Sequence, residues 1–459
     1  MWRYLVLKKL GIVLAETILL TGCVLLASYL RLRQSPLLGP EGFHNIQRAL
    51  FIALVFQAFL HLRDVYESPK ARSTIAFAYR LGQALTIASA VVWLLYSLFP
   101  VLNVGRRVYL GSLLFSSAFL IGWHLMLRGY FMHRRPRSNV LVLGTGRLAR
   151  ELVKEILRKP ELGLGVRGFV DDKPELVGVS IVNPTVVGLY HDLPQLIKKH
   201  KIDRIVVELQ DRRGRLPVEE LLQLKTQGIE VEDATSFYER VSGKIAIENL
   251  KPSWMIFSSG FHFSQRRLLQ KRIVSIAASV LFLLLSLPLL LLVALLIKLD
   301  SPGPVFFRQK RVGKDGRVFM LWKLRSMRRD AESMTGAVWA EKDDPRVTRL
   351  GRLLREFRID EIPQLLNVIK GDMDLVGPRP ERPEFVSQLE AEIPYYSLRH
   401  TVKPGVTGWA QINYGYANSV ELTTEKLQYD LFYIKNMSWL LDAIILFQTV
   451  KTVLVKRGY

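Results

Sequence analysis

The chain has 459 residues, of which 49% are hydrophobic and 23% charged, and a formal net charge of +23. This length is too great for one ordinary domain, and so large an excess of basic residues indicates an anionic partner, for which nucleic acid, anionic lipid and a phosphorylated substrate are the candidates. The single cysteine, Cys23, lies in an apolar stretch, which excludes a disulfide framework and a cysteine-based metal site.

Four apolar stretches in the first part of the chain predict a helical membrane bundle within residues 1–130. They cover residues 10–30, 46–62, 81–99 and 108–127. Each has about 17–21 residues, enough to cross a hydrocarbon core of about 30 Å. Glu16 is costly in lipid, so we expect it to face another helix. Basic residues are more frequent at the two ends of this region and in the loop after the second stretch than in the loops after the first and third stretches. This distribution predicts that both ends of the region lie in the cytoplasm.

A fifth apolar stretch, residues 273–297, contains no charged residue and is also long enough to span a membrane. Basic residues flank it on both sides, whereas a spanning helix needs a cytoplasmic signal at one end only. Pro288, two residues after Ser286, lies past its middle and would bend the chain. We therefore predict a re-entrant helix pair within residues 265–300. A kinked but complete span is the alternative, and it would place the C-terminal domain outside the cytoplasm, away from nucleotide substrates.

Strands that alternate with helices predict a parallel α/β domain between residues 138 and 250. The predicted strands cover residues 139–146, 167–172 and 203–209, and the first predicted helix covers residues 146–157. Gly144, Gly146 and Ala149 fit the permissive form of the dinucleotide fingerprint, with a helix N-terminus available for phosphate. The domain is therefore expected to be Rossmann-like, with Gly144, Gly146 and Arg147 as candidate cofactor-binding residues.

This glycine motif is weak by itself. The acidic pair Asp171–Asp172 begins 27 residues after Gly144, later than the spacing of about 20 expected for a ribose contact. The domain also has no Tyr-x-x-x-Lys pair, which a short-chain nucleotide-sugar oxidoreductase would need. Three interpretations stay open: a structural or regulatory domain with a tight turn, a domain that binds a nucleotide or nucleotide-sugar as an effector, and, least favoured, a redox enzyme.

The C-terminal third is rich in arginine, Gly-Pro turns and paired acids. Asp360 and Glu361 are adjacent acids with apolar neighbours, and Pro363 follows at a position typical of a first helical turn. Phosphoryl transfer between anionic substrates needs a metal and basic side chains to offset charge. Mg²⁺ prefers carboxylate and phosphate oxygens, and an aspartate can act as a covalent nucleophile. The pair is thus a catalytic and Mg²⁺-binding candidate, although a helix cap would use the same residues.

Four segments of this region resemble the bacterial sugar transferase family of polyprenyl-phosphate hexose-1-phosphate transferases. They are SPGPVFFRQKRVG (301–313), FMLWKLRSM (319–327), LLREFRIDEIPQLLNVIKGDMDLVGPRPE (353–381) and KPGVTGWAQIN (403–413). The preceding membrane and α/β regions are similar to those of the large members, such as undecaprenyl-phosphate glucose or galactose phosphotransferases. The resemblance implies a mainly α-helical catalytic domain, residues 301–459, which faces the cytoplasm from the bacterial inner membrane and is preceded by a re-entrant membrane helix near Ser286–Pro288.

The resemblance also implies a reaction. Asp360 would attack the β-phosphate of a UDP-sugar, release UMP and carry the phosphosugar until undecaprenyl phosphate takes it up, which initiates exopolysaccharide or O-antigen synthesis. Glu361 would assist at Mg²⁺ and in activating the acceptor phosphate. The residues that would bind substrate are Arg311, Lys323, Arg325, Arg355, Arg379 and Lys403. Membrane lipid and a second copy of the chain are further expected partners, and nucleic acid is not.

One segment departs from the family pattern. Many relatives continue from Gln-Val-Asn with Gly-Arg-Asn, whereas here Gln-Ile-Asn at residues 411–413 is followed by Tyr-Gly-Tyr-Ala-Asn at residues 414–418. The missing arginine leaves the sugar preference open. The Tyr-Gly-Tyr form looks like the branch associated with exopolysaccharide systems that accompany exosortase-type sorting.

Three other functions compete with the transferase. A membrane-anchored sensor or scaffold would bind a nucleotide in the α/β domain and dock its basic C-terminal domain on anionic lipid, so that Asp360→Asn would be silent. An oxidoreductase would need the missing Tyr/Lys pair. A nucleic-acid binder would group its basic residues with exposed aromatics, whereas many of them lie beside predicted membrane segments. The ordered set of motifs favours the transferase.

Overall fold

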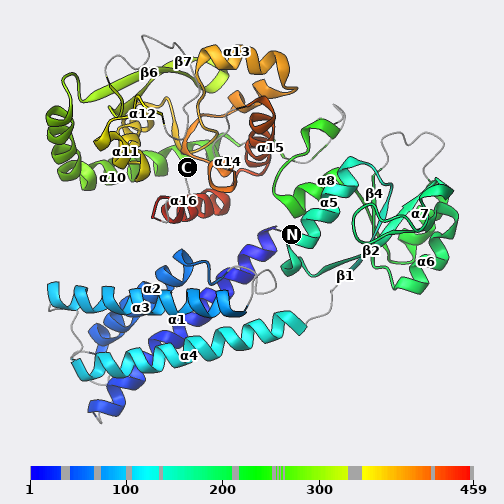
Figure 1. The fold of residues 1–459 in the computed structure, drawn as a ribbon, viewed down its shortest axis with the longest axis horizontal. Coiled ribbons are helices and arrows are strands. Elements are labelled where there is room, and N and C mark those ends of the chain that lie inside the picture. Colours follow the sequence, from blue (N-terminus) through cyan, green and yellow to red (C-terminus); the bar gives the residue numbers. More distant parts are fainter. Residues whose placement is uncertain are drawn as a thin grey trace. The chain divides into compact units, whose positions relative to one another are not determined.

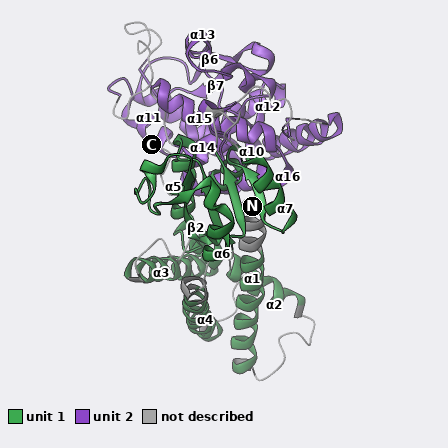
Figure 2. Ribbon diagram, turned by 90° about the vertical axis from the view of Figure 1, so that its right-hand side faces the viewer, with its two compact units in different colours: residues 1–242 green, residues 243–459 purple. Residues whose placement is uncertain are grey.

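The protein was analysed as a computed structural model, which describes residues 2–32, 42–66, 74–99, 106–133, 138–208, 217–250, 264–328, 344–414 and 419–454, and the single positions 255, 258, 260 and 261. The chain divides into two compact units, residues 1–242 and 243–459, which Figure 2 shows in different colours. The first unit holds four long helices and an α/β sheet, and the second holds a fifth long helix and the segments that carry the paired acids.

The four predicted N-terminal membrane stretches form helices. These are α1 (Trp2–Leu32), α2 (Gly42–Leu62), α3 (Thr74–Leu98) and α4 (Arg106–His133). Each is long and apolar enough to cross a membrane by length and composition. Their common core includes one fully buried residue from each helix, namely Leu20, Phe56, Ala88 and Leu120. The first region is therefore a helical bundle, as the hydropathy pattern predicts.

Glu16 is completely buried in this bundle. One carboxylate oxygen, Oε1, lies 2.9 Å from Nε2 of His124 on α4. The other oxygen accepts a hydrogen bond from the hydroxyl of Tyr66, which follows α2. The prediction that Glu16 faces other helices is thus confirmed, and the pairing accounts for a carboxylate in an apolar stretch.

The middle region is a five-stranded parallel sheet with the strand order β3-β2-β1-β4-β5. The strands are β1 (Ser138–Leu143), β2 (Leu164–Asp171), β3 (Val186–Leu189), β4 (Arg204–Val207) and β5 (Glu230–Asp233). The helices are α5 (Arg147–Arg158), α6 (Leu193–His200), α7 (Val218–Thr226) and α8 (Ala234–Ser242), with short 3-10 turns η3 (Pro160–Leu162), η4 (Pro174–Leu176) and η5 (Tyr190–Asp192). In Figure 1, α5 and α8 cover one face of the sheet and α6 and α7 the other. The predicted parallel α/β fold is confirmed.

The fifth apolar stretch forms one helix of 36 residues, α10 (Gln265–Asp300), which contains Pro288. The predicted pair of helices is therefore a single helix, because one proline can kink a helix without ending it. Figure 1 shows that the ribbon of α10 changes direction along its length. Near its C-terminal end, Val293 and Ile297 pack against Leu324 and Leu354 of the same unit.

Two adjacent basic residues in the N-terminal part of α10 bind other residues of this unit. Arg272 donates hydrogen bonds to the carbonyl oxygens of Val368 and, at 2.9 Å, Ile369. Lys271 is buried, and its Nζ lies 3.1 Å from Oδ2 of Asp442. Both ends of α10 therefore contact the domain that contains the paired acids.

The rest of this unit is mainly helical, as predicted. Its helices are α11 (Arg349–Glu356), α12 (Gln364–Lys370), α13 (Pro383–Glu392), α14 (Trp409–Asn413), α15 (Val420–Asn436) and α16 (Trp439–Leu454), with 3-10 turns η6 (Ile247–Asn249), η7 (Lys314–Gly316), η8 (Ile359–Glu361) and η9 (Tyr396–Thr401). The antiparallel strands β6 (Phe306–Val312) and β7 (Val318–Leu324) form one hairpin, and β8 (Asp374–Val376) pairs in parallel with β9 (Gly405–Thr407). At Gly351, on α11, an added Cβ would lie 1.9 Å from the carbonyl oxygen of Ser326, so this helix packs directly on backbone.

Candidate active site

The turn η8 presents Asp360 and Glu361 between α11 and α12. Arg358 precedes it with φ +55°, a left-handed conformation that interrupts the helical backbone between α11 and η8. Asp360 is 5% exposed and Glu361 7% exposed. Two adjacent carboxyl groups are thus buried together, where each must be compensated by basic groups or neutralised.

One carboxylate oxygen of Glu361 contacts three basic side chains. Its Oε1 lies 2.7 Å from Arg379, 3.2 Å from Arg358 and 3.4 Å from Lys323. Burial raises the pKa of Glu361, but these three cations outweigh burial and hold the pKa well below its usual range. Glu361 in turn raises the pKa of Arg379. The glutamate is therefore a fixed negative charge that keeps Arg379 and Lys323 at the site.

Asp360 has the opposite character. Its Oδ1 is buried and has no hydrogen-bond partner among the residues that the structure describes. Burial raises the pKa of this carboxyl group, Lys323 opposes the rise, and the negative charge of Glu361 adds to it. Leaving a buried acceptor without a hydrogen bond is costly. This oxygen is therefore available to a ligand or substrate, whereas the neighbouring Glu361 is already paired with basic side chains.

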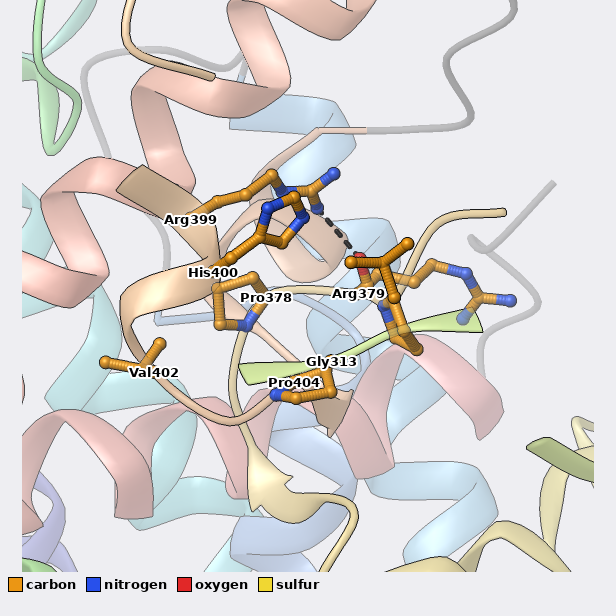
Figure 3. A pocket seen from close by; sticks show the side chains of 9 residues that line it. Gly313, Pro378, Arg379, Arg399, His400, Val402 and Pro404 are labelled. Carbon is orange, nitrogen blue, oxygen red and sulfur yellow. Dashed lines mark hydrogen bonds between the residues drawn. The ribbon is translucent and has the colours of Figure 1, made fainter. Parts of the chain in front are cut away.

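Arg399 holds the loop that carries Arg379. The Arg399 guanidinium donates to the carbonyl oxygen of Arg379 at 2.8 Å, to the hydroxyl of Tyr396 at 2.6 Å and to Oδ2 of Asp430 at 3.0 Å. Figure 3 shows a small pocket beside this loop, lined by Pro378, Arg379 and Arg399 among others, and none of its lining residues is acidic. Arg379 thus lines this pocket and also contacts Glu361 through its side chain.

Glu381 fixes the other end of the same loop. Its carboxylate accepts a hydrogen bond from Lys426 at 2.7 Å and lies 3.6 Å from Arg311. Burial raises the pKa of Glu381, but Lys426, Arg399 and Arg311 together lower it to about 2. Arg311 also donates to the carbonyl oxygen of Pro380 at 3.1 Å. Arg311 therefore shapes the Gly-Pro-Arg-Pro loop.

The structure brings some of the six predicted substrate-binding residues to the acids and places others elsewhere. Lys323 and Arg379 contact Glu361, and Arg355 lowers the pKa of Asp360. Arg325 instead donates to the carbonyl oxygens of Pro302, Ile297 and Ser301, at the C-terminal end of α10. Motif similarity alone does not distinguish a basic residue that lies beside the acids from one that binds backbone carbonyl oxygens elsewhere.

Lys403 also lies apart from the acids. Burial lowers the pKa of Lys403, and the charges that act on it most strongly are those of Asp374, which opposes the fall, and Arg272, which adds to it. Two residues outside the predicted substrate-binding set also take part: Arg358, one of the arginines close to the acids in the sequence, contacts Glu361, and Arg399 binds the loop of Arg379. Arg358 has a local signal, since it precedes Glu361 by three residues, whereas nothing in the sequence near Arg399 indicates its contacts.

The paired acids fit Mg²⁺ only if the substrate completes its ligands. In the described part of the chain, no group of three or more His, Cys, Asp or Glu side chains could hold a metal. Asp360 Oδ1, however, is a buried carboxylate oxygen for which the described residues supply no hydrogen-bond partner. Mg²⁺ typically keeps several waters and binds one or two carboxylates together with substrate phosphates, and this donor set agrees with that pattern.

The predicted glycine loop of the middle region follows β1. Gly144 has φ +94°, and the N–H of Gly146 donates to Oε2 of Glu208 at 3.1 Å. Arg147 pairs with Glu151 at 3.3 Å on the surface of α5. A carboxylate of the chain itself therefore lies where the fingerprint predicts a ligand phosphate.

The segment that departs from the family pattern is described only in part. Residues 415–418, which include most of the Tyr-Gly-Tyr form, lie outside the described residues. Tyr414 stacks on Tyr429, with ring centroids 6.2 Å apart.

Comparisons with known proteins place the chain in a family. The model of the bacterial sugar transferase family matches residues 266–456, and that of a CoA-binding domain matches residues 61–223. The UDP-glucose:undecaprenyl-phosphate glucose-1-phosphate transferase of Klebsiella pneumoniae is 30% identical over 89% of this chain and 88% of its own length. The enzyme of the same name from Escherichia coli is 35% identical over 72% of this chain and 69% of its own length.

A third relative is more similar over a shorter region. The UDP-N-acetylgalactosamine-undecaprenyl-phosphate N-acetylgalactosaminephosphotransferase of Aeromonas hydrophila is 50% identical over 188 residues, which is 41% of this chain and 44% of that protein. This match thus spans less than half of the relative. The near full-length match to the Klebsiella protein, together with the match of the family model over residues 266–456, shows that the chain belongs to the bacterial sugar transferase family.

Proposed function

We propose that this protein transfers a sugar-1-phosphate from a UDP-sugar to undecaprenyl phosphate, the initiating step of exopolysaccharide or O-antigen synthesis. The names of its relatives support this reaction class. The observation that carries the proposal is Oδ1 of Asp360, which has no hydrogen-bond partner in the described part of the chain and is buried beside a glutamate that contacts three cations.

In the first half-reaction, Asp360 Oδ1 forms a bond to the β-phosphorus of the UDP-sugar. The bond between that phosphorus and the oxygen bridging to UMP breaks, and its electron pair leaves with UMP. An aspartyl phosphosugar remains on the enzyme. Arg355, Lys323 and Arg379 offset the negative charge of the phosphates, and their fixed positions cost no reorganisation during the reaction.

In the second half-reaction, a phosphate oxygen of undecaprenyl phosphate attacks the same phosphorus. The bond to Asp360 breaks, which restores the carboxylate and gives undecaprenyl-diphosphate-sugar. Glu361 keeps the basic side chains oriented through both steps. Asp360 and Glu361 would hold Mg²⁺, which when bound neutralises part of the phosphate charge.

We further propose that α10 is re-entrant and that the catalytic domain lies at the cytoplasmic face of the bacterial inner membrane. Both ends of α10 contact the catalytic domain, through Arg272 and through Ile297. Its middle exposes large apolar side chains, such as Leu285 at 68% and Leu291 at 66%. A dip into one leaflet covers this apolar surface and keeps both basic flanks on one side. A homodimer is proposed on the family resemblance alone.

The test is UMP release from the purified protein with Mg²⁺, undecaprenyl phosphate and UDP-glucose, UDP-galactose or UDP-N-acetylgalactosamine. We expect Asp360→Asn to lower the rate by about 10³-fold or more with whichever donor is used. Asp315→Asn, an exposed aspartate of the same unit, is the matched control and should retain activity. Without lipid acceptor, radiolabelled phosphosugar should stay on the denatured wild-type protein and be absent from Asp360→Asn.

Two results would count against the proposal. Equal rates in Asp360→Asn and the wild type would remove Asp360 from the chemistry and favour the scaffold interpretation. UMP release that depends on Asp360 but leaves no phosphosugar on the protein would keep the transferase reaction and replace the covalent step by direct attack of the lipid phosphate.

A further inference from the structure

The glycine loop of the middle domain is packed against the end of β4. A Cβ added to Gly144 would lie 2.0 Å from the carbonyl oxygen of Glu208, and a Cβ added to Gly146 would lie 2.3–2.6 Å from the carboxyl atoms of Glu208. In dinucleotide-binding folds the corresponding glycine lets a pyrophosphate approach the backbone. Here the space over Gly146 holds a side chain of the same domain, so the two glycines are required by Glu208.

Glu208 has the position and the charge of a bound anion. Its residue is 7% exposed, and Oε2 accepts the N–H of Gly146, which directly precedes the 12 residues of α5. The N-terminus of such a helix carries a partial positive charge and favours an anion. The other oxygen, Oε1, has no hydrogen-bond partner among the described residues. A single hydrogen bond thus holds a buried carboxylate at this helix end.

Internal hydrogen bonds close the remainder of the loop. The Thr145 hydroxyl donates to Oδ2 of Asp171 at 2.7 Å, across the carboxyl end of β2. Arg150 Nε donates to the carbonyl oxygen of Thr145 at 2.8 Å. Asp171, at the end of β2, and Glu208, which follows β4, therefore both contact the glycine loop after β1. The strand order of the sheet reverses at β1, and α/β sheets bind their ligands at such a position.

We propose that Glu208 occupies the phosphate position of this domain, so that a nucleotide carrying a pyrophosphate enters the glycine loop only when Glu208 is displaced. Two features support a displaceable group. The Glu208 carboxylate would repel a phosphate placed at the same N–H. Only one of its two oxygens has a hydrogen-bond partner within the described residues, so the buried carboxylate is incompletely satisfied where it lies. The domain that matches the CoA-binding model is thus closed by its own side chain.

The experiment is isothermal titration of CoA, a pyrophosphate nucleotide, into the full-length protein in detergent, with Glu208→Ala as the test variant. Glu175→Ala removes an exposed carboxylate of the same domain and is the matched control. We expect Glu208→Ala to bind CoA about tenfold or more tightly than the wild type, and the control to bind like the wild type. The catalytic unit is the same in all three proteins, so binding there cancels in the comparison.

Equal CoA binding by wild type and Glu208→Ala, whether tight or undetectable, would overturn the proposal, as would an equal gain in Glu175→Ala. Circular dichroism and thermal unfolding without ligand establish that each variant is folded. If Glu208→Ala does not fold, Glu208→Gln takes its place, since its amide oxygen can still accept the Gly146 N–H while the negative charge is gone. A gain in CoA affinity is again the supporting result and no gain the contrary one.

Discussion

Replacing Arg399 by methionine tests how the loop that carries Arg379 is held. The side chains of Arg399 and Asp430 are 3% and 2% exposed and lie 3.0 Å apart. Removing one partner of a buried ion pair costs about 3–5 kcal/mol, because the other charge stays buried and unpaired. We therefore expect Arg399→Met to lower the free energy of unfolding of the C-terminal unit by about 3–5 kcal/mol.

The pH dependence of this loss has a definite sign. Burial raises the pKa of Asp430, and Arg399 opposes the rise. Without Arg399 the pKa rises further, so the buried aspartate takes up a proton more readily. The destabilisation caused by Arg399→Met is therefore full above the pKa that Asp430 has in the folded variant. It decreases as the pH falls through that pKa, because the unpaired aspartate is then neutralised.

Urea unfolding in detergent at neutral and mildly acidic pH measures the effect, with the exposed Arg352→Met as control. Because Arg399 also binds the carbonyl oxygen of Arg379, we expect kcat/KM for UMP release to fall by about 10–100-fold as Arg379 loses its position. An unfolding free energy within about 0.5 kcal/mol of the wild type, together with unchanged kinetics, would refute the assignment of Arg399 as a positioning residue.

Three further predictions follow from the geometry. The pKa of Asp360 is raised above its ordinary 3.8 by burial, so the rate of UMP release should fall as the pH drops through a midpoint above 3.8. In Glu361→Gln the residual rate should have a lower midpoint, since a neighbouring negative charge is lost, and an unmoved midpoint would argue against this coupling. Gly351→Ala should destabilise the protein by about 1–3 kcal/mol in thermal unfolding, because its Cβ would lie 1.9 Å from a backbone oxygen; a neutral result would mean that α11 can shift. His124→Leu should lower the thermal stability of the membrane bundle by leaving Glu16 without its partner at 2.9 Å, and a stability equal to that of the wild type would show that this pair adds nothing.

The main divisions of the fold were predictable because they depend on local patterns. Long apolar stretches gave the five long helices, and alternating strands and helices gave the parallel sheet. Within this sheet, β3 and β5 were missed, because Gly188 interrupts the apolar pattern of β3 and because β5 has the sequence Glu-Val-Glu-Asp, which is not apolar. The single helix α10 was predicted as two, since the proline signal gives a bend and does not say whether the helix continues.

The candidate site was predictable only in part, for a related reason. Asp360 and Glu361 are adjacent acids in an apolar context, which is visible in the sequence. Arg399 is not, because its partners Arg379 and Asp430 are 20 and 31 residues away along the chain and meet it only after folding. Arg325 belongs to a recognisable motif, yet it binds carbonyl oxygens at the end of α10. A motif indicates that an arginine is needed and does not say for which contact.

The helix α12 connects the paired acids to α10. Its seven residues are about 10 Å long; Asp360 and Glu361 precede its first turn, and Arg272 of α10 binds the carbonyl oxygens of its last turn. A short helix therefore sets the separation between the paired acids and Arg272 of α10. If α10 lies in the membrane as proposed, the acids would follow it when the bilayer thickness changes and would keep their distance from the headgroup plane. The proposed transfer to a lipid phosphate would then take place at the same level in different membranes.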